Sequence, residues 1–82
     1  MWNEKTCACA AEGGHLEILQ WAREKGCEWD KWTCTGAAQG GHLEVLQWAR
    51  KNGCVWGQKD CQKQAALMGH TKVVAWIDAQ PE

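Results

Sequence analysis

The sequence predicts an all-α solenoid made of three stacked antiparallel helix hairpins, with little or no β structure. Three observations lead to this prediction. A 27-residue pattern recurs along the 82-residue chain, the apolar residues of each copy follow a helical spacing, and a glycine turn divides each copy into two short segments, with paired glycines in the first two copies and Gly69 in the third. A period of about 20–50 residues is typical of solenoids, in which each unit buries its apolar face only against its neighbours.

The repeat is visible when two segments are aligned. Residues 2–28 read WNEKTCACAAEGGHLEILQWAREKGCE, and residues 29–55 read WDKWTCTGAAQGGHLEVLQWARKNGCV. A third copy begins at Trp56, keeps the register as far as Cys61 and then gains one residue. We therefore expect a single domain over residues 1–82 that consists of repeats 2–28, 29–55 and 56–80, the last serving as a C-terminal capping repeat.

The first helix of each copy begins at a residue suited to the N-cap position. These residues are Asn3, Asp30 and Gly57. Each of them follows a tryptophan, which is placed to pack against the first turns of the helix as a hydrophobic staple. Inside the helix of the second copy, Cys34, Ala37 and Ala38 share one face, and their small side chains allow a neighbouring helix to approach closely.

The second helix of each copy follows a glycine and a histidine, at Gly14-His15, Gly41-His42 and Gly69-His70. In the second copy it is expected from about His42 to Lys51, where the apolar stripe includes Leu43 and Leu46. Gly53 then suits the left-handed position that ends a helix. The tryptophans of the three second helices are expected to line the core between repeats; they are Trp21, Trp48 and Trp76.

Composition and charge exclude several classes of partner. The net charge is −1, so no excess of positive charge is present to neutralise phosphates, and we expect no nucleic-acid partner. The longest apolar runs have five residues, as at 73–77, whereas a membrane span needs roughly 20, so we expect no membrane partner either. Met1 is not followed by an apolar leader, which favours a cytoplasmic location with reduced cysteines.

The six cysteines suggest a zinc site or a disulfide framework at first sight. No C-x-x-C pair occurs, and equivalent cysteines of neighbouring repeats are expected about 8–10 Å apart, too far to share a metal with Zn–S bonds of about 2.3 Å. We expect Cys9, which breaks the period, to be exposed and the other five to be small buried hydrophobes. Two pairs are seven residues apart across a short loop, and their oxidation is left open: Cys27 with Cys34, and Cys54 with Cys61.

Catalytic chemistry is not indicated. The three histidines recur at the start of each second helix, at His15, His42 and His70, where a structural role suffices. No set of nucleophile, base and orienting residue is visible, and the glycine pairs lack the lysine of a phosphate-binding loop. The sequence therefore predicts no catalytic residue, no metal ligand, no cofactor and no enzymatic activity.

The string AA-x-GGHLE-[IV]-LQWAR-x-x-GC resembles the ankyrin repeat, in which T-P-L-H-x-A-A-x-x-G-H-x-x-V-V-x-x-L-L-x-x-G-A recurs about every 33 residues. The resemblance covers all three copies. Most of the shortening to 27 residues falls in the loop between repeats, so we expect the β-hairpin fingers of the family to be absent. The resemblance implies a non-enzymatic scaffold for protein–protein recognition. Two origins fit so regular a chain: a segment of a longer repeat array, or a consensus-type design.

The first-helix positions that differ between copies form the predicted binding surface, because the stack does not require a particular residue there. They are Lys5, Ala8, Glu12, Trp32, Thr35, Gln39, Lys59 and Gln62. Trp32 stands where the other copies have lysine, and exposed tryptophan is enriched at binding hot spots. The alternative is a surface tryptophan that lies over its neighbours.

The two ends of the chain differ. The third copy is more polar, with Gln62, Lys63 and Gln64 in place of small residues, as expected for a cap. The first copy lacks a polar outer face, which predicts self-association or further repeats at that face. The alternative function, from a different class, is a metal-binding or redox-responsive cysteine-rich protein, whose melting temperature would depend on chelator or reductant.

Overall fold

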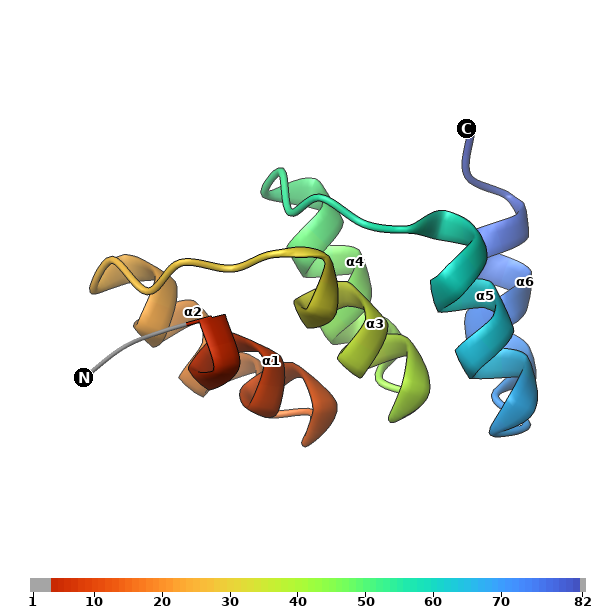
Figure 1. Ribbon diagram of the computed structural model, residues 1–82, viewed down its shortest axis with the longest axis horizontal. Helices are drawn as coiled ribbons and strands as arrows, with labels where there is room; N and C mark the ends of the chain where they lie inside the picture. Colours follow the sequence, from red (N-terminus) through yellow and green to blue (C-terminus); the bar gives the residue numbers. More distant parts are fainter. Residues whose placement is uncertain (1–3, 82) are drawn as a thin grey trace.

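The computed structural model describes residues 4–81, with side chains from Thr6 to Pro81. This part of the chain forms six helices and no strand: α1 (Glu4–Glu12), α2 (Leu16–Glu24), α3 (Lys31–Gln39), α4 (Leu43–Lys51), α5 (Gln58–Leu67) and α6 (Thr71–Asp78). Consecutive helices pair as hairpins, and the three hairpins stand side by side in chain order (Figure 1). The predicted all-α solenoid is confirmed, and no β-hairpin finger interrupts residues 4–81.

Local sequence signals set the helix ends. Asp30 is the N-cap of α3, and its Oδ1 accepts a hydrogen bond of 3.0 Å from the backbone N–H of Trp32. Gly57 takes the same position before α5, whereas Asn3 lies outside the described residues together with Trp2. Gly53 follows α4 with φ of +84°, as predicted for a helix that ends in a left-handed residue.

The turn inside each hairpin has the same geometry in all three repeats. In the second repeat, Gly41 has φ of +75° and its N–H donates to the carbonyl of Ala38, while the N–H of His42 donates to the carbonyl of Ala37. This pair of bonds is the Schellman arrangement, which satisfies carbonyls that the helix end leaves free. The chain thus reverses within three residues, 40–42 in this repeat, and the second helix packs antiparallel to the first.

The core is formed by small and aliphatic side chains that the stack encloses completely. Leu19, Leu46 and Ile77 are the largest of its fully buried side chains. Small residues on the inner face of α3, such as Ala37 and Ala38, are also fully buried. Because these side chains are short, α1, α3 and α5 come close enough to contact one another in turn.

The tryptophans pack at the edge of this core. Trp29 lies edge-on to Trp48, with ring centroids 5.4 Å apart, and Trp56 lies edge-on to Trp76 at 5.8 Å. Both second-helix tryptophans in these pairs pack against the core. The expectation for Trp21 is wrong, since half of its surface is exposed. Trp21 belongs to the first hairpin, whose outer face is not covered by another repeat within residues 4–81.

Two arginines connect neighbouring repeats through these edge tryptophans. The guanidinium of Arg23 lies 4.4 Å from the ring centroid of Trp29, and that of Arg50 lies 4.7 Å from the ring centroid of Trp56. Each arginine belongs to the repeat that precedes its tryptophan. This cation–π contact therefore holds one hairpin to the next.

Candidate functional site

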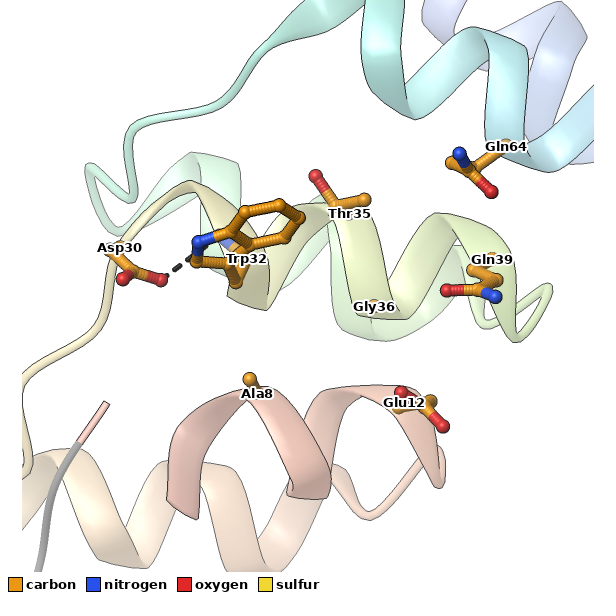
Figure 2. Close-up of a pocket in the computed structure, with 8 residues that line it drawn as sticks. All are labelled: Ala8, Glu12, Asp30, Trp32, Thr35, Gly36, Gln39 and Gln64. Carbon is orange, nitrogen blue, oxygen red and sulfur yellow. Dashed lines mark hydrogen bonds between the residues drawn. The ribbon is translucent and has the colours of Figure 1, made fainter. Parts of the chain in front are cut away.

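A groove of about 540 Å³ crosses the first-helix face of the stack. Residues from three helices and one loop line it: Ala8, Glu12, Asp30, Trp32, Thr35, Gly36, Gln39 and Gln64. Figure 2 shows α1 along one side, α3 as the floor, and Gln64 of α5 on the other side. We call this feature the groove.

The groove lies where the first helices pack unequally, because α3 contacts α1 more extensively than it contacts α5. A Cβ atom on Gly36 would lie 3.2 Å from the carbonyl oxygen of Ala8, so glycine lets α3 approach α1 closely. In the third copy the residue that precedes Ala65, as Gly36 precedes Ala37, is Gln64. The side chain of Gln64 borders the groove on the side of α5, whereas Lys63 is exposed and does not line it.

Trp32 lies at one end of the groove, with 58% of its surface exposed. Its backbone N–H is held by Asp30, and the ammonium of Lys31 lies 5.3 Å from its ring centroid. The cap therefore fixes where the tryptophan leaves the helix, while most of the indole remains available for contact. An exposed ring with a fixed backbone can bury a large apolar area on a partner at little cost in conformational entropy.

The floor and the far end of the groove are each held by a hydrogen bond, and the far end is polar. Thr35 is 9% exposed, and its hydroxyl donates to the carbonyl of Lys31 at 3.0 Å. At the far end, the carbonyl of Gln39 accepts a hydrogen bond from Nε2 of His70 at 3.0 Å. The side chains of Glu12 and Gln39 are exposed there and supply a carboxylate and an amide. The groove thus joins an apolar end at Trp32 to a polar end.

A family model described as "Ankyrin repeats (many copies)" matches residues 7–50, more than half of the chain. The chain belongs to the ankyrin repeat family. Searches of the curated proteins and of the solved structures found no match. Ankyrin repeats are in general protein–protein interaction modules and typically act as non-enzymatic scaffolds.

The groove brings together five of the eight predicted surface residues. These are Ala8, Glu12, Trp32, Thr35 and Gln39. Lys59 is exposed outside the lining, and Gln62 is half-buried and donates a hydrogen bond to the Asp78 carboxylate. The side chain of Lys5 lies outside the described residues.

Sequence comparison missed three of the lining residues: Asp30, Gly36 and Gln64. Asp30 is an N-cap in the sequence, and its position two residues before Trp32 is the signal for its place in the lining. Gln64 belongs to the stretch where the third copy gains its extra residue, and that insertion is the feature of the sequence that could have indicated it.

The cysteines of this ankyrin chain are distributed as expected for structural residues. Cys9 is exposed, and the other five are completely buried. The cysteines that meet are not the pairs separated by seven residues, Cys27 with Cys34 and Cys54 with Cys61. The thiol of Cys7 donates to Sγ of Cys27 at 2.9 Å, and the thiol of Cys34 donates to Sγ of Cys54. Each loop cysteine thus meets the first helix of its own repeat, because the chain returns along that helix after the hairpin.

Burial controls the ionisation of these thiols. Desolvation, together with the hydrogen bond to Cys27, raises the pKa of Cys7 to about 12. The pKa of Cys34 is also raised, by its hydrogen bond to Cys54 and by burial. The same hydrogen bond lowers the pKa of Cys54, while burial raises that of Cys61. Thiols whose pKa is raised are poor nucleophiles at neutral pH, because the thiolate is the reactive form.

Within residues 4–81, no group of three or more histidine, cysteine, aspartate or glutamate side chains is arranged to hold a metal ion. None of the helices in this range combines the length and the apolar character needed to cross a bilayer.

Proposed function

We propose that this chain is a non-enzymatic ankyrin scaffold that recognises a protein partner through the groove, with Trp32 as the anchor. One observation carries the proposal. Five of the eight first-helix positions at which the copies differ line one groove, although the stack itself does not require their identity. Residues that vary within an otherwise regular repeat are the ones available to specify a partner.

The lining indicates what the partner offers. The exposed indole of Trp32 suits an apolar or aromatic side chain. At the other end, the exposed carboxylate of Glu12 suits a basic or hydrogen-bond-donating group. We therefore propose an extended or helical protein segment that carries an apolar side chain and a donor along one side. Lys5, Lys59 and Gln62 are part of the proposal as flanking residues.

The test compares two half-exposed tryptophans. Trp32→Ala removes the anchor, while Trp21→Ala removes a tryptophan of similar exposure outside the groove lining. Affinity capture with wild type and both variants, at matched circular dichroism spectra, is expected to retain the same protein with wild type and Trp21→Ala and to lose it with Trp32→Ala. Equal retention by Trp32→Ala would remove Trp32 as the anchor and the groove as the site.

A redox response is the second candidate, and the paired thiols favour it. In Cys7–Cys27 the two sulfur atoms lie 2.9 Å apart. Exchange with oxidised glutathione would join the two sulfurs, break the glutathione disulfide, and transfer the two thiol protons to the glutathione sulfurs, which gives two glutathione thiols. Disulfide mapping after such treatment is expected to find Cys7–Cys27 and Cys34–Cys54, with a changed melting temperature. Full retention of free thiols would dismiss this candidate.

The proposal also includes a location and a second kind of contact. Free buried cysteines are typical of proteins in a reducing compartment, which supports a cytoplasmic location. The near-neutral charge of −1 gives no support for nucleic acid as a partner. Self-association through the outer face of the first repeat is proposed as well.

A further inference from the structure

At both junctions between repeats, a histidine of the following repeat lies on a glycine of the preceding repeat. A Cβ atom on Gly14 would lie 2.6 Å from the ring of His42, and one on Gly41 would lie 2.5 Å from the ring of His70. The two contacts are equivalent in the repeat. The glycine therefore has to lack a side chain, because the histidine ring occupies that space.

A β-branched residue three positions after the histidine completes each junction. Val45 and Val73 are each 2% exposed. Val73 borders the same hollow as Gly41 of the preceding repeat. The histidine and the valine thus form one unit that each repeat presents to its predecessor.

The first repeat presents the same unit with nothing covering it among the described residues. Ile18 is the counterpart of Val45 and Val73, and 50% of its surface is exposed. His15 is exposed, whereas His42 and His70 are half-buried. We call His15 and Ile18 the N-terminal face.

The third repeat carries the matching receptor, also uncovered. Gly69 is the counterpart of Gly14 and Gly41, but a Cβ atom on it would meet nothing within 4 Å. Ala66 is exposed, although its counterparts Ala11 and Ala38 are fully buried. We call Ala66, Gly69 and Val74 the C-terminal face.

This receptor is a hollow. Its volume is about 330 Å³, and Ala66, Gly69, Thr71 and Val74 are among the residues that line it. Val74 is half-buried, while the leucines at the same register, Leu19 and Leu46, are fully buried. The C-terminal face therefore has the geometry of a junction between repeats, and nothing covers it within residues 4–81.

We propose that this chain associates head to tail, with the N-terminal face of one copy docked on the C-terminal face of another. The ring of His15 lies on Gly69, Ile18 enters the hollow, and Nε2 of His15 donates to the carbonyl of Leu67, as His70 does to Gln39 within the chain. The two faces are different, so the contact is heterologous and repeats into a linear oligomer. The proposal develops the self-association named above and does not depend on the groove.

Charge supports this pairing. Glu17 and Glu44 border the same hollow at the first junction, so two like charges lie side by side there. At the contact between copies, Lys72 of one copy takes the position that Glu17 has at the first junction, and Glu17 of the next copy takes the position of Glu44. The contact therefore brings opposite charges together. The cation–π contact is lost, however, because Asp78 stands at the position of Arg23 and Arg50. Association between copies is therefore weaker than stacking within the chain, and reversible.

The experiment uses one blocked variant for each face. Ile18→Glu places a carboxylate on the N-terminal face, and Ala66→Glu places one on the C-terminal face; both positions are exposed, so each variant is expected to keep the wild-type circular dichroism spectrum. Val55→Glu is the control, since Val55 is exposed and belongs to neither face. Sedimentation velocity is measured from low micromolar to near-millimolar protein, with reductant present so that Cys9 does not cross-link copies.

Wild type and Val55→Glu are expected to sediment faster as concentration rises, and each blocked variant is expected to remain a monomer. A mixture of the two blocked variants is expected to form a dimer that does not grow further, because each retains one working face. Wild type that stays monomeric overturns the proposal. Loss of association in only one blocked variant also overturns it, since that result indicates a symmetric contact of one face with itself.

Discussion

A matched pair of glycine substitutions measures the contact that joins neighbouring repeats. Gly41 and Gly69 have the same backbone, with φ of +75° and +76°, and each N–H donates to the carbonyl three residues earlier at 3.1 Å. Their surroundings differ. A Cβ atom on Gly41 would lie 2.5 Å from the ring of His70, whereas one on Gly69 would meet nothing within 4 Å.

The expected difference follows from these two environments. Both Gly41→Ala and Gly69→Ala place alanine at positive φ, which costs roughly 1–2 kcal/mol in either variant. Only Gly41→Ala also displaces the ring of His70 and breaks its hydrogen bond to Gln39, and such a bond contributes about 0.5–1.5 kcal/mol. With the disturbed packing added, we expect Gly41→Ala to lower the free energy of unfolding by about 1–2 kcal/mol more than Gly69→Ala.

Urea unfolding followed by circular dichroism provides the assay, at protein concentrations low enough to keep the chain monomeric. The difference corresponds to a melting temperature lower by roughly 4–8 °C for each kcal/mol in a domain of this size. Repeating both substitutions in a His70→Ala background gives a double-mutant cycle. Equal destabilisation by the two substitutions, or a difference that persists without the imidazole, would refute the stacking of histidine on glycine.

Three further predictions concern the thiols and one buried hydroxyl group. The free energy of unfolding should fall as pH rises between about 9 and 12, because the pKa of Cys7 is raised from 9.0 to about 12 in the folded chain and the unfolded chain loses that proton first; Cys7 contributes at most about 1.4 kcal/mol per pH unit to this slope, so the slope should be smaller in Cys7→Ala, and an unchanged slope would contradict this. Thr33→Val should raise the free energy of unfolding by about 1 kcal/mol, because the Thr33 hydroxyl is buried without a hydrogen-bond partner within residues 4–81; a lower urea midpoint would show that the hydroxyl is satisfied. Brief treatment with iodoacetamide should label Cys9 alone in the folded protein and all six cysteines in urea, as counted by intact mass, and rapid labelling of a second thiol would show that the core opens readily.

Much of the site was predictable from the sequence, and the errors have identifiable causes. Trp32 was expected to be exposed because its counterparts are lysines, and it is. Thr35 lines the groove, but only 9% of its surface is exposed, because it packs against the first turn of α3 and Cys61. Gln62 does not line the groove, because its amide donates a hydrogen bond to the carboxylate of Asp78 in α6. Variation between copies identifies the face of a helix but not the neighbour that a side chain meets.

The sequence by itself determined the repeat, the six helices and the burial of five cysteines. These features depend on interactions within a few residues: the Asp30 cap, the left-handed glycines, and the helical spacing of small and apolar side chains. Such local signals are present in every copy of the repeat, so the three copies predict the same pair of helices independently.

Only the tertiary structure decided which distant residues meet. It paired Cys7 with Cys27 and not Cys27 with Cys34, and it placed Gln64 across the groove from Gln39. It also left Ile18 and Gly69 uncovered at opposite ends of the stack. The physical reason is that these contacts depend on the spacing between whole helices, which the packed volume of many side chains sets together and which no short segment of the chain specifies.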